Sequence, residues 1–162
     1  MHQRLAIFTT GGTIDKIYFD AKSEFQVGDP QIVELLKEAN AHFEYQVEPL
    51  LRKDSLDLDE DDRSLIRDRI VAVGCTRVLV THGTDTLVET ALRLLDVDGK
   101  TIVLTGAMQP ARLRVSDAIF NIGYAVAAAQ ILPPGVYIAI NGQLFDPRRC
   151  RKNVAGNRFE SC

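Results

Sequence analysis

The sequence predicts an open α/β fold: a mostly parallel, doubly wound sheet with flanking helices, in a single domain over residues 1–162. Two observations lead to this prediction. Apolar runs of strand length recur along the chain, several of them rich in Val and Ile and apolar on both faces, as in a buried parallel sheet. Segments of helical periodicity lie between these runs, and alternation of strands with helices is typical of parallel α/β sheets.

The first half of the chain gives two strands and two helices. Residues 4–9 form an apolar run that stops at the glycine pair Gly11 and Gly12, and residues 45–50 form the second run. Between them, Pro30 stands in the expected first turn of a helix over 30–42, where a missing N–H is tolerated. Acidic residues precede and begin the next helix, 59–73, where carboxylates suit the helix dipole.

The second half continues the alternation. The expected strands are residues 77–81, 101–105 and 136–140, and the expected helices are residues 85–95 and 115–130. The acidic stretch DSLDLDEDDR does not match a calcium loop, because it lacks the glycine of the sharp turn and the terminal glutamate. No repeat, low-complexity tract or linker interrupts the pattern, so we expect one domain.

Composition favours a small-molecule partner. The 162 residues are 46% hydrophobic and 25% charged, close to the averages of globular proteins, and the net charge is -3. Lys and Arg are scattered, which gives no electrostatic footprint for a nucleic acid or an anionic membrane. We therefore expect neither as a partner.

Cysteine and histidine spacing predicts no disulfide framework and no metal site. The residues concerned are Cys75, Cys150, Cys162, His2, His42 and His82, and none of the spacings fits a zinc ligand set. The N-terminal apolar run breaks at glycine, so it is too short for a signal peptide or a membrane span. We expect a cytoplasmic protein.

Polar residues gather where the predicted strands end, which is where open α/β sheets bind ligands. The stretch TTGGTIDK follows the first strand and THGTDT follows the third. Thr13 either closes a turn or presents its hydroxyl to a substrate, and Thr84 or Asp85 either caps a helix or binds a ligand. Ser55, after the second strand, belongs either to a turn or to a ligand contact. TTGGT lacks the endings of the known phosphate loops, which argues against a nucleotide site.

Four stretches together resemble the bacterial-type L-asparaginases: TTGGTID, VLVTHGTDTLVETA, KTIVLTGAMQPARLRVSDAIFN and INGQLFDPRRCRKN. They follow one another in order over nearly the whole chain. The resemblance implies an enzyme that hydrolyses L-asparagine to L-aspartate and ammonia without a metal or organic cofactor. It also implies a homo-oligomer, at least a dimer.

The resemblance assigns roles residue by residue. Thr13 matches the nucleophile, Tyr18 the tyrosine of the loop beside it, and Lys152 the lysine that forms a triad with Thr84 and Asp85. The implied substrate-binding positions are Ser55 for the α-carboxylate, its neighbour Asp54, Gly83, Asp85 for the α-ammonium, and Ala107 for the side-chain amide. A threonine hydroxyl needs a neighbouring base, and the lysine acts either as that base or as a charge that orients the others.

The chain departs from the family in two respects. The family carries a second, C-terminal domain, and we expect residues 1–162 to form the N-terminal catalytic domain without it. Asp15 stands where the family prefers a small residue. Alternative functions are a glutaminase-asparaginase, since one methylene is worth only about 1 to 3 kcal/mol of discrimination, and a non-catalytic amino-acid-binding domain or partner subunit of an amidotransferase assembly.

Overall fold

A parallel sheet forms the centre of the molecule. The computed structural model describes residues 3–19 and 24–162, so His2 lies outside the described residues. The central sheet contains β1 (Leu5–Gly11), β4 (Tyr45–Lys53), β5 (Arg77–Thr81), β6 (Thr101–Thr105), β7 (Gly135–Ile140) and β8 (Gln143–Phe145). Among the described residues these six strands pair in the order β4-β1-β5-β6-β7-β8, and only β8 runs antiparallel to its neighbour. The predicted fold class is confirmed.

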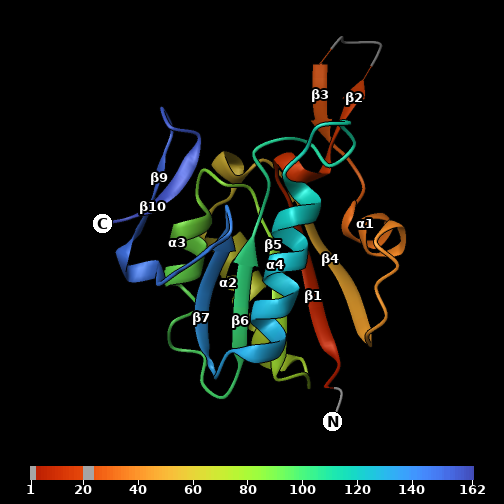
Figure 1. Cartoon of the computed structure of the whole chain (residues 1–162). Helices are drawn as coiled ribbons and strands as arrows, with labels where there is room; N and C mark the ends of the chain where they lie inside the picture. The colour runs from red at the N-terminus through yellow and green to blue at the C-terminus, as the bar shows by residue number, and fades with distance from the viewer. Residues whose placement is uncertain (1–2, 20–23) are drawn as a thin grey trace.

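Helices cover both faces of this sheet. They are α1 (Ile32–Glu38), α2 (Glu60–Ala72), α3 (Leu87–Leu92) and α4 (Ala118–Ile131). Alternate residues of β1 divide between two cores: Ala6 and Phe8 pack with α2 and α3, whereas Leu5 and Ile7 pack with α1 and α4. Figure 1 shows α4 lying across one face of the sheet, with α2 behind it. Strands that are apolar on both faces therefore belong to a sheet buried on both faces.

The strands agree with the expected positions more closely than the helices do. Strands β5 and β6 have the predicted bounds, whereas α1 and α3 are shorter than expected at both ends. Pro30 precedes α1, whose N-cap is Gln31. Helix α3 begins after Thr86, so neither Thr84 nor Asp85 is its N-cap. The capping interpretation of those two residues is thus wrong.

Short elements at the edges were not expected. Strands β2 (Lys16–Phe19) and β3 (Glu24–Val27) form one antiparallel hairpin, and β9 (Cys150–Asn153) and β10 (Arg158–Ser161) form another. Figure 1 shows both beyond the carboxyl ends of the parallel strands. Within the described ranges no helix is both long and apolar enough to cross a membrane.

Candidate functional site

The predicted site residues meet where the strand order reverses. The chain runs from β1 outward to β4 and then returns to the other side of β1 at β5, so the crevice between β1 and β5 is the switch point at which such sheets bind ligands. A Cβ on Gly12 would lie 2.4 Å from the Cα of Gly83. The turns after β1 and β5 are thus in direct backbone contact, which places Thr13 beside the THGTDT stretch.

Ser55 lies on the other side of Gly83. A Cβ on Gly83 would lie 2.6 Å from the Cβ of Ser55 and 2.7 Å from its Oγ. Ser55 opens a 3₁₀ turn, Ser55–Asp57, is buried, and its Oγ accepts from the N–H of Thr86 at 3.3 Å. The structure therefore places Ser55 in a turn, and the contact with a substrate carboxylate stays a prediction.

Lys152 joins Thr84 and Asp85. Its Nζ donates to Thr84 Oγ1 at 2.8 Å and to Asp85 Oδ1 at 2.7 Å, although 67 or more residues separate the partners in sequence. The lysine side chain is mostly buried, whereas the Asp85 side chain is partly open to solvent. An ammonium held between a hydroxyl and a carboxylate can order the hydroxyl and stabilise negative charge that develops nearby.

Asp54 contacts strand β2, which also carries Tyr18. Asp54 pairs with Lys16 at 3.2 Å and accepts from the N–H of Leu56 at 3.1 Å. Partial burial raises the pKa of Asp54, but the Leu56 N–H and the ammonium groups of Lys16 and Lys152 outweigh it and lower the pKa overall. Tyr18 lies on β2, where its ring packs edge-on against Phe25 and is 53% exposed.

Ala107 is buried in a loop, residues 106–109, that follows β6. The Asp117 carboxylate accepts from the N–H of Met108 at 2.9 Å and from that of Gln109 at 3.0 Å. A Cβ on Gly106 would lie 2.3 Å from the His82 carbonyl oxygen, so the loop also contacts the turn after β5. We name residues 106–109 the Ala107 loop.

His82 is fully buried directly behind Gly83. Its Nδ1 lies 2.6 Å from the Gly83 carbonyl oxygen and its Nε2 lies 2.7 Å from Thr90 Oγ1, which also accepts from Arg63 Nε at 3.2 Å. Because a carbonyl can only accept, Nδ1 carries the proton, and Thr90 donates to Nε2. Burial lowers the pKa of His82 to about 4, so the ring is neutral and fixes the direction of the Gly83 carbonyl.

Asp15 is a buried carboxyl two residues from Thr13. Its Oδ1 accepts from the N–H of Gln31 at 2.9 Å, and its carbonyl accepts from the N–H of Gly28 at 2.8 Å. Burial raises the pKa of Asp15 to about 7, against the lowering effect of the Gln31 N–H and of Arg52. Asp15 thus ties the turn after β1 to the segment that leads from β3 to α1.

Threonines fill the sheet just beneath the site. Thr9, Thr81 and Thr105 lie opposite one another in the register of β1, β5 and β6. Their hydroxyls are buried and have no hydrogen-bond partner among the residues that the structure describes. Some of the threonines that gather at the strand ends in the sequence are therefore buried in the sheet.

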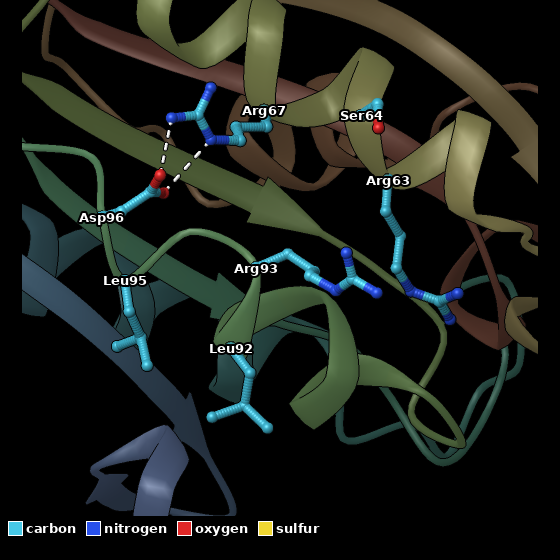
Figure 2. Close-up of a pocket in the computed structure, with 7 residues that line it drawn as sticks. All are labelled: Arg63, Ser64, Arg67, Leu92, Arg93, Leu95 and Asp96. Carbon is cyan, nitrogen blue, oxygen red and sulfur yellow. Dashed lines mark hydrogen bonds and ion pairs between the residues drawn. The ribbon is translucent and has the colours of Figure 1, made fainter.

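A separate cavity of about 360 Å³ lies between α2 and α3 (Figure 2). Arg63, Arg67 and Arg93 line it, which suggests an anion site at first sight. Each of them, however, has a carboxylate partner: Arg63 pairs with Glu89 at 3.4 Å, Arg67 with Asp96 at 2.8 Å, and Arg93 with Glu60. The positive charge is neutralised within the protein, and no predicted site residue lines this cavity.

Comparison with known proteins identifies the family. The family model "Asparaginase, N-terminal" matches residues 4–161. The chain belongs to this asparaginase family. An L-asparaginase of Bacillus licheniformis is 29% identical over 97% of this chain and 52% of its own length. A glutaminase-asparaginase of Pseudomonas fluorescens biotype A is 26% identical over 97% of this chain and 48% of its own.

A solved asparaginase structure has the same fold. L-asparaginase I of Vibrio cholerae superposes on 99% of this chain and 52% of its own, with a TM-score of 0.87 and 28% identity. The present chain spans about half the length of the relatives it matches. The resemblance read from the four sequence stretches is therefore confirmed at the level of family and fold.

Proposed function

We propose that this asparaginase-family chain is an L-asparagine amidohydrolase that uses Thr13 as its nucleophile. The observation that carries the proposal is the Thr84–Lys152–Asp85 group, bonded at 2.7 to 2.8 Å and placed at the switch point of the sheet. The contact of Gly12 with Gly83 puts the Thr13 turn against the turn that bears this group. A hydroxyl nucleophile needs such a neighbouring group to take its proton.

The reaction proceeds in two steps. The Thr13 hydroxyl oxygen bonds to the side-chain amide carbon of asparagine, its proton passes by way of the Thr84 hydroxyl to the Lys152 amine, which must be unprotonated at this step, and the tetrahedral oxyanion collapses. The C–N bond breaks, the nitrogen takes a proton and leaves as ammonia, and an ester remains on Thr13. Water then attacks the ester carbon, which releases L-aspartate and restores the Thr13 hydroxyl. Backbone N–H groups of the glycine turns would stabilise the oxyanion.

The substrate is held by its charged ends. Asp85 receives the α-ammonium, Ser55 and Asp54 lie on the side of the α-carboxylate, and Gly83 contributes backbone. Ala107 lines the amide, and Tyr18 closes over Thr13 from the β2–β3 hairpin. Two close approaches support this arrangement. Ser55 lies against Gly83, and a Cβ on Gly106 would lie 3.3 Å from Cγ2 of Thr84.

Substitution of Thr13 tests the proposal. The Thr13→Ala variant should release no ammonia from L-asparagine while keeping the wild-type circular dichroism spectrum and melting temperature. Thr13→Ser, which keeps a hydroxyl, should retain measurable turnover. Wild-type rates in the alanine variant would show that another group is the nucleophile.

A glutaminase-asparaginase is the second candidate, because a relative with that name matches almost the whole chain. Parallel kinetics with L-glutamine distinguish it, since comparable kcat/KM values for the two amides would favour the dual activity. We also propose that the protein acts in the cytoplasm and assembles into at least a dimer. Light scattering coupled to gel filtration measures the assembly directly, and a monomer at working concentration would contradict it.

A further inference from the structure

Asn121 is a fully buried amide in α4 that the proposed mechanism does not use. Its Nδ2 donates to the Gly106 carbonyl at 2.9 Å and to Asp117 Oδ2 at 3.0 Å, and its Oδ1 accepts from the N–H of Asn141 at 3.2 Å. The N–H of Asn141 can only donate and the Gly106 carbonyl can only accept, so the partners fix the orientation of the amide. Two of the bonds reach other segments, at Gly106 and Asn141, and the third reaches Asp117 at the N-cap of the same helix. Loss of any one leaves a buried polar group unpaired.

One side of Asn121 holds the Ala107 loop. Asn121 fixes the carbonyl of Gly106 and also contacts Asp117, whose carboxylate fixes the N–H groups of Met108 and Gln109. Ala107 lies between these anchors and is itself buried. The position that lines the substrate amide is therefore set from α4.

The other side of Asn121 leads to Lys152. Asn141, whose φ of 55° lies in the left-handed region, donates its N–H to Asn121 and accepts at Oδ1 from the N–H of Phe159 at 2.9 Å. Phe159 is buried and lies opposite Lys152 in the β9–β10 ladder. A short path of hydrogen bonds therefore runs from Asn121 to the strand pair that carries the lysine.

We propose that Asn121 is a positioning residue that fixes the Ala107 loop and the Lys152 hairpin relative to each other. The kinetic consequence rests on the proposed function; the mechanical coupling does not. Reactive geometry is sensitive, and a misplacement of about 1 Å costs on the order of 10²-fold in rate. Loosening the loop shifts the preference between asparagine and glutamine, whereas loosening the hairpin lowers kcat for both amides by the same factor.

Three variants separate these effects. Asn121→Asp replaces the Nδ2 donor by an oxygen that faces Gly106 and Asp117 but keeps an acceptor for the N–H of Asn141, so it disturbs the Ala107 loop directly and the hairpin only through the coupling. Asn141→Gly keeps the backbone N–H and tolerates a positive φ but removes the acceptor for Phe159. Asn157→Gly is the matched control, since Asn157 is exposed, has a φ of 49°, and lies in the turn of the same hairpin.

Amide hydrogen exchange and kinetics give the readouts. In Asn121→Asp the amides of Met108, Gln109 and Phe159 should exchange about tenfold faster or more, and the asparagine-to-glutamine ratio of kcat/KM should change. In Asn141→Gly only Phe159 should exchange faster, with kcat reduced about tenfold and the ratio unchanged. If the variants show these exchange patterns but the wild-type protein releases no ammonia, the coupling is supported and the proposed function is refuted.

The opposite outcomes overturn the inference. Wild-type exchange at Phe159 in a folded Asn121→Asp variant would show that the two sides are independent. A uniform loss of activity in step with melting temperature, at an unchanged substrate ratio, would assign Asn121 a merely structural role. If Asn121→Asp does not fold, Asn141→Gly decides: no difference from Asn157→Gly in Phe159 exchange and in kcat refutes the proposal.

Discussion

Asp15 should make the protein less stable as pH rises towards neutrality. The unfolded chain releases the Asp15 proton near pH 3.8, whereas the folded protein keeps it until about pH 7. Between these values the folded state binds one proton more, so the free energy of unfolding falls with rising pH by up to about 1.4 kcal/mol per pH unit. The loss levels off above pH ~7 at roughly 4 kcal/mol in total.

The Asp15→Asn variant isolates this contribution. An amide is neutral at every pH and its oxygen can still accept from the N–H of Gln31. Urea unfolding at fixed ionic strength should give equal stabilities for variant and wild type near pH 4, and a variant more stable by about 4 kcal/mol at pH 8. Asp29→Asn is the control, because Asp29 is an exposed neighbour that pairs with Arg52. Parallel stability curves for Asp15→Asn and wild type would refute the reasoning.

Other predictions concern the remaining groups of the site. Lys152→Met should lower kcat for asparagine by about 10²-fold or more with the fold intact, whereas Arg151→Met, on the exposed side of the same strand, should keep it; equal losses would contradict the role of Lys152. His82 has the opposite pH sign to Asp15. Because its folded pKa lies near 4, below the usual 6.5, the free energy of unfolding should fall by about 3 kcal/mol as pH drops from 6.5 to 4. In urea unfolding of His82→Gln between these pH values, the free energy of unfolding should depend less on pH. An asparagine analogue without the α-amino group should lose at least about tenfold in kcat/KM, because it cannot pair with Asp85; equal rates would exclude that contact.

Strands β1, β5 and β6 could be predicted from sequence because each is buried on both faces. An uninterrupted apolar run such as Val78 to Val80 needs cover on both faces of the sheet, so the run itself predicts a buried strand. The hairpins could not be predicted this way. Strands β2, β3, β9 and β10 are four residues each, so even a regular alternation such as that of Glu24–Val27 is too short to identify a strand. The Gly156–Asn157 pair is the one turn signal that could have marked β9 and β10.

Some residues of the candidate site could likewise be predicted from sequence and others could not. The strand ends that meet at the switch point follow from topology, so Thr13, Ser55 and Gly83 could be grouped from sequence. Lys152 could not, because only the resemblance linked it to Thr84, 68 residues earlier. Asp117 and Asn121 gave only a weak local signal, since most of their partners lie in other segments of the chain. The spacing of four residues between them, which puts both on one face of a helix, was the available hint.

The measurement that tests the central claim most directly is the joint release of ammonia and L-aspartate from L-asparagine by the purified chain. Calorimetry on the Thr13→Ala variant would report asparagine binding in parallel. The account predicts equal amounts of both products from the wild type, and binding without release in the variant. Asparagine binding by a folded wild type that releases neither product would contradict it and favour an amino-acid-binding or partner subunit.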